Sequence, residues 1–426
     1  MSDWSSRDRK YVWHPFTQIQ TAPEPLLIVR AKDTVLFSED GKEYIDCNSS
    51  WWVNVHGHGN KHIVNAIAEQ ALKLDHVIFA GVTHPKAIEL SERVANLLPE
   101  HLQKVFFSDD GSTAVEVALK MAFQFWHNQG TPKKRVLALD GAYHGDTFGA
   151  MSVGQRGYFN EPFEYFFFDV DFLDFPTKKN EIELLEEAEL LFATGDFSAL
   201  IVEPLVQGSA GMRMYDASWL DKLVSIARKY QVLVIFDEVM TAWGRTGKLF
   251  AMDYCTLKPD IVCLSKGLTG GVLPLGLTVA TEQIFQAFLD REKSKAFLHG
   301  HSFTGNAIAC AAACASLDIF EENETWQNIA RIANFYQDKF SELEKHPAIE
   351  SVRMIGTILA IDIKTEGGST YFSNIHDQAY DFFSKNGLLM RPLGNVIFLN
   401  PPYCITDEQL QFSYSKILEF ASSLSY

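Results

Sequence analysis

Three consecutive segments decide the fold class: SALIVEPL (198–205), SWLDKLVSIARKY (218–230) and VLVIFDE (232–238). The first and third are short, apolar and rich in β-branched residues, which is typical of strands buried on both faces. The middle segment spaces its apolar residues along one face of a helix. A strand, a helix and a second strand in this order predict a parallel sheet covered by helices.

The alternation continues on both sides of these segments. Strand-like segments precede and follow them, at KVFFS (104–108), RVLAL (135–139) and DIVCLSK (260–266), and STAVEVALKMAFQFW (112–126) is helix-like. Later segments differ: 335–346 predicts a helix, and 355–364 and 395–402 predict strands. The sequence therefore predicts an α/β fold with a mostly parallel sheet in a large domain, 51–310. A smaller α+β domain would combine 1–50 with 311–426.

Composition limits the class of protein. Hydrophobic residues make up 47% and charged residues 21% of the 426 residues, as in globular proteins. The formal net charge of −17 argues against a nucleic acid or an anionic membrane surface as the main partner. The first residues lack a basic region followed by an apolar one, and no apolar stretch approaches the roughly 18 residues of a membrane span. Six cysteines without a C-x-x-C motif predict reduced thiols in a cytoplasmic protein.

In α/β sheets ligands gather where strands end, and the strand 104–108 ends at DDGSTAVEVA (109–118). Gly111 and Ser112 at the start of a helix would offer N–H groups and the helix dipole to an anion. The alternative is purely structural. Ser112 or Thr113 would then cap the helix, and Thr113 with Glu116 fits a capping box.

Two further strand ends carry candidate site residues. Tyr143, in YHGDTFGAMSVG (143–154), would present its ring to a planar ligand or be a half-buried tyrosine without a ligand. Asp237 closes a buried strand, and a buried carboxylate needs a cationic or hydrogen-bonding partner. Arg245 is a candidate for a structural ion pair with it.

Lys266 follows a fourth strand, in LSKGLTGG (264–271). A Walker A loop places its lysine after the glycines, so this motif is excluded. The remaining alternatives are an exposed lysine and a desolvated, nucleophilic amine that forms a Schiff base. The His-x-His pairs in 56–62 and 299–302 occur without a zinc motif, so no metal is predicted.

Four longer stretches carry a family resemblance: YHGDTFGAMS (143–152), FDEVMTAWGRTGKLF (236–250), PDIVCLSKGLTGG (259–271) and HGHSFTGNAIACAAA (299–313). Along nearly its full length the chain resembles the class III branch of fold-type-I pyridoxal-phosphate aminotransferases. The resemblance implies pyridoxal 5'-phosphate as cofactor, small-molecule substrates, and a homodimer with shared active sites.

The resemblance also implies roles for the residues at the strand ends. Lys266 would carry the cofactor as an imine and then shuttle a proton. Asp237 would pair with the ring nitrogen, and Tyr143 would stack on the ring. Gly111 and Ser112 would bind the phosphate.

A second part of the cofactor site is implied to come from the partner subunit. The loop that contains Gly300, His301 and Ser302 would reach across, with the Ser302 hydroxyl on the phosphate. Family members usually have threonine at this position, so the hydroxyl is kept and the methyl group is lost.

Stretches 13–18, 49–58, 206–215 and 391–403 resemble, more narrowly, the branch that aminates 8-amino-7-oxononanoate in biotin biosynthesis with S-adenosylmethionine as donor. In that branch Arg391 would bind the substrate carboxylate and Tyr403 would lie in the substrate site. Trp51 and Trp52 would line the aliphatic chain.

Two departures from the family pattern bear on the substrates. Phe16, which would contact the substrates, stands where users of S-adenosylmethionine commonly have tyrosine, and Ala242-Trp243 replaces the usual Gly-Phe. The alternatives are therefore lysine as donor to the same acceptor, or another class III ω-aminotransferase that acts on ornithine, 4-aminobutyrate or a diamine.

Overall fold

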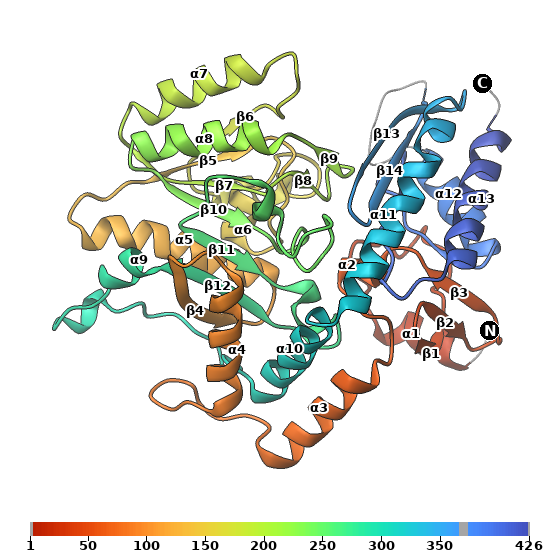
Figure 1. Ribbon diagram of the computed structural model, residues 1–426, viewed down its shortest axis with the longest axis horizontal. Coiled ribbons are helices and arrows are strands. Elements are labelled where there is room, and N and C mark those ends of the chain that lie inside the picture. Colours follow the sequence, from red (N-terminus) through yellow and green to blue (C-terminus); the bar gives the residue numbers. More distant parts are fainter. Residues whose placement is uncertain (1–2, 366–373, 425–426) are drawn as a thin grey trace.

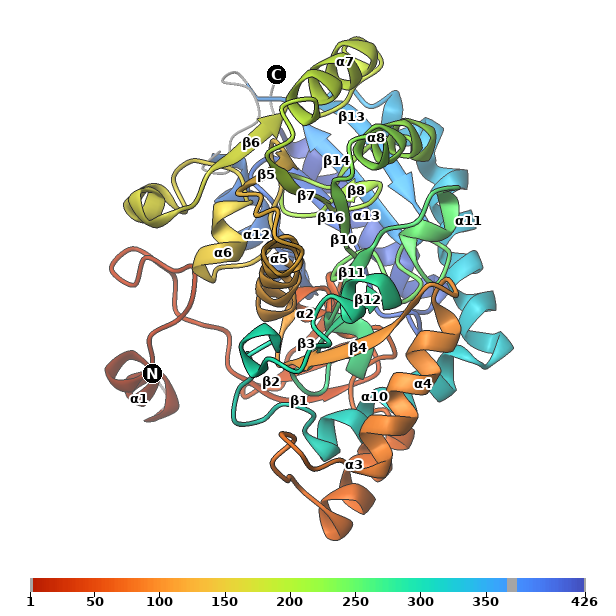
Figure 2. The same ribbon diagram turned by 90° about the vertical axis from the view of Figure 1, so that its left-hand side faces the viewer.

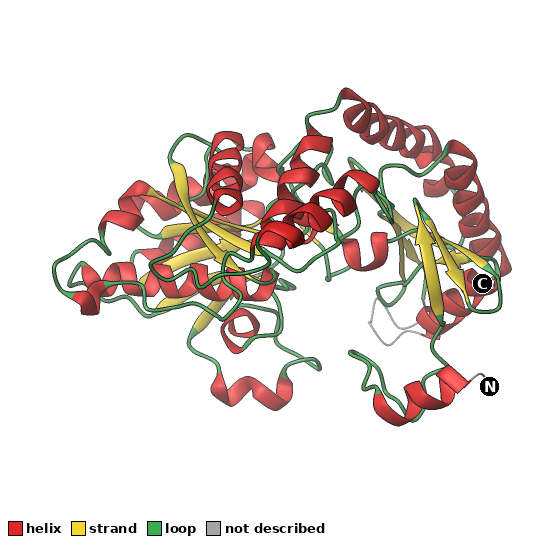
Figure 3. Cartoon of the chain, turned by 90° about the horizontal axis from the view of Figure 1, so that it is seen from below, coloured by secondary structure: helices red, strands yellow, loops and turns green. Residues whose placement is uncertain are grey.

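A computed structural model describes residues 3–365 and 374–424. It consists of a large body built around one sheet and a smaller body that combines both ends of the chain (Figure 1). In the view from below, the two bodies lie side by side (Figure 3). The predicted α/β fold class is confirmed.

The central sheet has seven strands in the order β4-β12-β11-β10-β7-β5-β6. It is parallel except at β12, which runs antiparallel to both β11 and β4. The strands are β4 (Leu102–Ser108), β5 (Arg135–Leu139), β6 (Val170–Leu173), β7 (Phe197–Val202), β10 (Leu233–Asp237), β11 (Ile261–Leu264) and β12 (Gly276–Thr281). All five strands predicted here from apolar runs are present, since β4, β5, β7, β10 and β11 coincide with them.

Helices cover both faces of this sheet because alternate strand residues point to opposite sides. On one face, Leu233 and Ile235 pack with apolar residues of α5 (Gly111–Asn128). On the other face, Val234 and Phe236 pack with α7 (Glu181–Phe192) and α8 (Ala217–Lys229). Figure 2 shows α5 on the opposite side of the strands from these two helices.

The smaller body joins distant parts of the chain. β15 (Leu388–Leu389) pairs in parallel with β3 (Glu43–Asp46), which extends the antiparallel strands β1 (Ile28–Lys32) and β2 (Val35–Ser38). A separate antiparallel sheet contains β13 (Ile349–Ile355), β14 (Ile358–Ile363) and β16 (Val396–Leu399). The helices here are α11 (Asn323–Glu344), α12 (Asn374–Lys385) and α13 (Asp407–Ser423).

Helix α10 (Ala307–Phe320) connects the two bodies and packs against α3 (Lys61–Lys73) and α4 (Pro85–Leu97). The proposed domain boundary at 310/311 falls inside this helix. The other elements are α1 (Asp3–Tyr11), α2 (Ser49–Trp52), α6 (Phe148–Ser152), α9 (Glu282–Gln286), β8 (Val206–Gln207), β9 (Arg213–Met214), and the 3-10 helices η1 (Glu161–Phe166), η2 (Ala251–Tyr254), η3 (Lys266–Thr269) and η4 (Lys293–Lys295). None of the helices in the described residues has the length and apolar character needed to cross a bilayer.

Candidate active site

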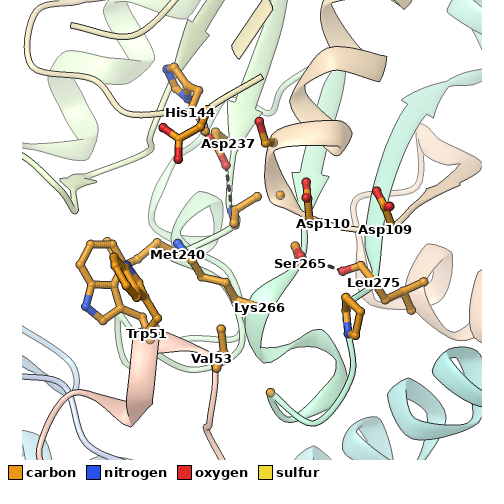
Figure 4. Close-up of a pocket in the computed structure, with 18 of the residues that line it drawn as sticks. Trp51, Val53, Asp109, Asp110, His144, Asp237, Met240, Ser265, Lys266 and Leu275 are labelled. Atoms are coloured by element: carbon orange, nitrogen blue, oxygen red, sulfur yellow. Dashed lines mark hydrogen bonds and ion pairs between the residues drawn. The ribbon is translucent and has the colours of Figure 1, made fainter. Parts of the chain in front are cut away.

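A pocket of about 630 Å³ opens at the carboxyl ends of the parallel strands. Its polar lining comes from five strand ends: Asp110 after β4, His144 after β5, Glu203 after β7, Asp237 on β10 and Lys266 after β11. Residues far apart in the sequence meet here because parallel strands end at the same edge of the sheet. The close-up shows Lys266 and Asp237 directed toward the same space from different segments (Figure 4).

Lys266 lies at the base of this pocket in a constrained backbone. Its φ of 47° is in the left-handed region, which is uncommon for a residue with a side chain. The preceding residue is held on both sides: the Ser265 hydroxyl donates to the Leu275 carbonyl at 2.7 Å, and its own carbonyl accepts from the Trp243 indole at 3.1 Å. The turn therefore fixes the direction of the lysine.

Burial makes the amine of Lys266 easier to deprotonate than that of an exposed lysine. Burial lowers the pKa of Lys266 to about 8, with Arg245 acting in the same direction and Asp237 and Glu203 opposing it. The Lys266 Nζ atom lies 4.7 Å from the centre of the Trp52 ring. An amine with such a pKa has an appreciable nucleophilic fraction near neutral pH.

The glycines after Lys266 allow close approach of another segment. Gly271 has a φ of 79°, and a Cβ placed there would lie 2.6 Å from the carbonyl carbon of Val53. A side chain would displace the backbone that follows the paired tryptophans. These glycines thus bring Trp52 and Lys266 to the same wall of the pocket.

Asp237 has a partner that the sequence did not suggest. Its Oδ2 atom accepts a hydrogen bond from His144 Nδ1 at 2.7 Å, and its Oδ1 atom accepts from the Val239 N–H at 3.0 Å. Both side chains of the pair are buried, with Asp237 only 4% exposed. A carboxylate held by two hydrogen bonds in this way has a fixed orientation.

The suggestion that Arg245 pairs with Asp237 is wrong. Arg245 is buried, and its guanidinium donates to the Pro401 carbonyl at 2.8 Å. It also lies over the Tyr403 ring, 5.2 Å from its centre. Main-chain oxygens of Asn400 and Pro401, in the smaller body, accept from this arginine, so it links the two bodies. Its Nε atom is buried without a hydrogen-bond partner among the described residues.

The start of α5 lines another side of the pocket. Asp110, and neither Ser112 nor Thr113, is the N-cap, and the capping box pairs Asp110 with Thr113, not Thr113 with Glu116. Glu116 Oε1 accepts instead from the Gly149 N–H at the start of α6, at 2.6 Å. The prediction that Ser112 or Thr113 is the N-cap is therefore wrong. The Ser112 hydroxyl lies 2.8 Å from that of Thr147.

Two glycines leave room at this helix start. A Cβ on Gly111 would lie 2.6 Å from Val239 Cγ1, and a Cβ on Gly145 would lie 2.7 Å from Ser112 Cα. The first N–H groups of a helix have no partner within the helix, and the dipole favours an anion there. This end of α5 is therefore suited to a phosphate group.

Aromatic side chains surround the mouth of the pocket. Tyr143 lines it and donates through its hydroxyl to Asp146 at 2.9 Å. Trp51 lies over the opening with half of its surface exposed, and the Phe16 ring contacts it at 5.5 Å between ring centres. The Arg391 guanidinium lies 5.5 Å from the centre of the Trp51 ring.

Six predicted site residues do not line this pocket within one chain. Phe16 and Arg391 contact Trp51 at its mouth, and the other four lie elsewhere. Tyr403 is buried, and its hydroxyl donates to the Trp243 carbonyl at 2.6 Å. It therefore supports the turn at Trp243. Gly300, His301 and Ser302 lie in a loop away from the pocket, where the Ser302 carbonyl accepts from His76 at 2.6 Å.

Glu203 is a pocket residue that sequence reasoning missed. It follows β7, and its carboxylate accepts from the Tyr143 N–H at 3.1 Å and the Gly208 N–H at 2.9 Å. Its position at a strand end, in VEP, resembles that of Asp237 and was the available indication. Only the fold shows that it points into the same pocket.

Comparison with known proteins identifies the family. The model of aminotransferase class-III matches residues 17–420. The chain belongs to the class III aminotransferase family. The aminotransferase is 46% identical to the adenosylmethionine-8-amino-7-oxononanoate aminotransferase of Synechococcus elongatus, over 97% of this chain and 99% of the relative.

Solved structures agree with this family. The aminotransferase superposes with a TM-score of 0.94 on the adenosylmethionine-8-amino-7-oxononanoate aminotransferase of Methanocaldococcus jannaschii, at 34% identity over 99% of each chain. An amine transaminase from an uncultivated Pseudomonas species, solved with bound PLP, has a TM-score of 0.89 and 30% identity, with 96% of this chain and 98% of that chain covered. The aminotransferase thus has the fold-type-I architecture and depends on pyridoxal phosphate.

The pocket residues fit this cofactor. A lysine whose pKa is lowered by burial, a buried carboxylate and a helix that begins with a glycine correspond to its aldehyde, ring nitrogen and phosphate. Within the described residues, no group of three or more His, Cys, Asp or Glu side chains is placed to hold a metal ion.

Proposed function

We propose that this aminotransferase transfers an amino group to 8-amino-7-oxononanoate and forms 7,8-diaminononanoate in biotin biosynthesis. The observation that carries the proposal is the arrangement of an amine and a guanidinium along the paired tryptophans. Lys266 Nζ lies over Trp52, and the Arg391 guanidinium lies over Trp51. A keto acid with its carboxylate far from its carbonyl matches a reactive amine and a guanidinium placed at opposite ends of an apolar wall.

Arg391 is suited to bind the carboxylate of this acceptor. Its backbone N–H donates to Asn48 Oδ1 at 2.7 Å, which fixes the residue, and in the part of the chain that the structure describes its guanidinium forms no ion pair. A planar guanidinium can make two parallel hydrogen bonds to a carboxylate. The names of relatives such as the Synechococcus protein support this acceptor.

Pyridoxal phosphate, when bound, supplies a carbonyl that receives the donor's amino group and a ring that withdraws electrons. We propose that Lys266 holds it covalently and that Asp237 keeps a proton at its ring nitrogen. Tyr143 would cover the ring, and the N–H groups of Gly111 and Ser112 would bind the phosphate. The carboxylate of Asp237 suits this role because His144 orients it away from solvent.

Lys266 would also move the proton during the transfer. A general acid–base group works best when its pKa is near the working pH, and burial brings the pKa of Lys266 to about 8. Trp52 and the turn at Ser265 would hold the amine on one side of the substrate. Trp51, Phe16 and Tyr143 would exclude water from the pocket mouth.

S-adenosylmethionine is the proposed amino donor, as the names of the relatives suggest. Phe16 bears on this choice because it contacts Trp51 and presents a ring without a hydroxyl at the mouth. A ring is sufficient for stacking on an adenine base. Lysine remains the alternative donor that the experiment below distinguishes.

A homodimer with shared sites is part of the proposal, as is a cytoplasmic location. Exposed apolar side chains that include Leu298 and Phe303 flank the loop 300–302, and Leu298 is 79% exposed. Such residues on a loop distant from its own pocket favour a second copy of the chain as their partner. Gly300, His301 and Ser302 would then complete the partner's cofactor site.

The test is a pair of half-reactions with the purified holoenzyme. The pyridoxamine form is mixed with 8-amino-7-oxononanoate or with 2-oxoglutarate, and recovery of the visible absorbance is followed in a single turnover. We expect fast recovery with 8-amino-7-oxononanoate only. Preference for 2-oxoglutarate would indicate an ω-aminotransferase of the ornithine, 4-aminobutyrate or diamine type.

The donor is identified in the other half-reaction. The pyridoxal form is mixed separately with S-adenosylmethionine and with lysine, and loss of the visible absorbance is followed. We expect loss with S-adenosylmethionine. Loss with lysine alone would show that the proposed donor is wrong while leaving the acceptor unchanged.

A further inference from the structure

Glu203 links the two aromatic walls of the pocket. One carboxylate oxygen accepts from the N–H of Tyr143 at 3.1 Å, and the other accepts from the N–H of Gly208 at 2.9 Å. Gly208 lies under Trp52, since a Cβ on it would be 3.0 Å from Trp52 Cζ3. A single buried carboxylate, 5% exposed, therefore supports both rings.

The same carboxylate lies among the charged groups at the base of the pocket. His144 and Asp237 both act on it electrostatically, and it acts in turn on Lys266. The Nε2 atom of His144 is buried and has no hydrogen-bond partner among the described residues. The His144 ring is thus fixed through one nitrogen only.

The segment at β9 contributes two further groups that face Glu203. Arg213, from β9, interacts with it electrostatically while donating to the Asp140 carbonyl. The hydroxyl of Tyr215 donates to the main-chain carbonyl of Glu203 at 2.7 Å. Neither residue forms an ion pair with the Glu203 carboxylate within the described residues, so burial, the nearby charges and two N–H groups set its ionisation.

We propose that Glu203 is a positioning residue of this site, which holds Tyr143 and Trp52 in place and, by its own ionisation, sets how firmly Lys266 keeps its proton. The inference rests on the proposed role of Lys266 as the residue that holds the cofactor. It adds a residue and a source of pH dependence that the proposed function does not contain.

The physical basis is charge in a desolvated site. Burial raises the pKa of Glu203 to about 7, with Asp237 acting in the same direction and His144 opposing it. Above that pH the anion stabilises the protonated amine of Lys266, because opposite charges interact strongly where water is excluded. Loss of the anion therefore makes the amine easier to deprotonate.

The experiment is an absorbance titration of the holoenzyme. The visible spectrum of the bound cofactor changes when the Lys266 nitrogen gains or loses its proton, so the midpoint is measured from about pH 5.5 to about pH 10. We expect Glu203→Gln to lower this midpoint by about 0.5 to 1 pH unit. The measurement needs no substrate, so it is independent of the proposed acceptor and donor.

Glu238→Gln is the matched control. Burial also raises the pKa of Glu238 to about 7, but its carboxylate accepts from Met252 at 2.7 Å and Ala251 at 2.9 Å and does not line the pocket. We expect its midpoint to equal that of the wild type. An unchanged midpoint in Glu203→Gln, or an equal shift in Glu238→Gln, would overturn the proposal.

Glu203→Asp separates charge from position and serves where Glu203→Gln does not fold. It keeps the anion, but its shorter side chain cannot reach both N–H groups. We expect a midpoint near that of the wild type together with a lower melting temperature. A large shift of the midpoint in this variant would contradict the role of the charge. Lys266→Ala, which tests the proposed role of the lysine, is a separate experiment.

Discussion

At the scale of single residues, Lys266 shows how a common side chain acquires specific chemistry. Its position after a buried strand, its left-handed backbone and its contact with Trp52 together remove the amine from bulk water. Burial then lowers the pKa of the amine to about 8, although two carboxylates oppose the change. Neither the lysine nor the glycines alone would have this effect.

The first prediction concerns this amine. Lys266→Ala should abolish the visible absorbance of bound cofactor and lower kcat by on the order of 10³ or more, because both the covalent hold and the moving proton are lost. The spectrum of the purified protein and steady-state kinetics measure these effects. Lys248→Ala, in the other glycine-containing turn GRTGK, is the control and should retain both. An unchanged spectrum in Lys266→Ala would refute the assignment.

The second prediction concerns the other end of the tryptophan pair. Arg391→Ala should raise the KM for the keto acid by roughly 100-fold, about 3 kcal/mol, because a bidentate, charge-assisted pair is lost. Arg391→Lys should recover only part of this affinity, since a lysine cannot make two parallel bonds. Retention of cofactor, measured by its absorbance, should be unaffected. An unchanged KM would place the carboxylate elsewhere.

At the scale of elements, the start of α5 and the loop after β5 form one unit. Gly145 has a φ of 121° and packs against Ser112, so the loop closes on the first turn of the helix. The Ser112 and Thr147 hydroxyls join the two segments at 2.8 Å. The sequence indicated a helix start here, whereas the loop that covers it becomes visible only in the fold.

The third prediction follows from this contact. Gly145→Ala should weaken cofactor binding by about tenfold or more, because the new Cβ would lie 2.7 Å from Ser112 Cα and displace the helix start. Gly130→Ala is the matched control at the other end of α5, where φ is 74° and no atom lies within 4 Å. Both variants carry backbone strain, but only the first should release cofactor in equilibrium dialysis. Equal affinities would contradict the proposed phosphate site.

At the scale of the whole molecule, the loop 300–302 lies away from the pocket of its own chain, and we propose that it completes the site of a second copy. The fourth prediction uses mixed dimers of Lys266→Ala and Ser302→Asp subunits. Each variant alone should be inactive, and random reassociation should restore about a quarter of the wild-type activity, because half of the dimers would carry one intact site. Recovery is measured after joint refolding. No recovery would show that Ser302 acts within its own chain or not at all.

The fifth prediction concerns stability and pH. Glu238 is buried, and its pKa is raised from 4.5 to about 7, so the folded state favours its neutral form. Its contribution to the free energy of unfolding should be fully present below pH 4.5 and be lost as the pH rises through 7, by up to about 3 kcal/mol. Urea unfolding of wild type and Glu238→Gln at several pH values measures the difference. A stability advantage of the wild type over Glu238→Gln that increases with pH would refute this sign.

The sequence by itself determined the elements and the chemical types at the strand ends. Apolar runs and helical spacing predicted β7, α8 and β10, because local periodicity is written along the chain. Lys266 and Asp237 were identified as candidates because each stands at the end of an apolar, strand-like segment. The two departures from the family pattern, Phe16 and Ala242-Trp243, could be identified in the sequence. Their effect on the choice of amino donor and on the shape of the site could not be derived from it.

Only the tertiary structure decided which groups face one another. His144 and Asp237 are 93 residues apart, and their bond forms because β5 and β10 end at the same edge of the sheet. The fold also places Glu203 where it accepts from the Tyr143 N–H. It places Arg245 against the Pro401 carbonyl and not against Asp237. The physical reason is that burial and charge depend on distances in space, whereas the sequence records only the residue types and their local spacing.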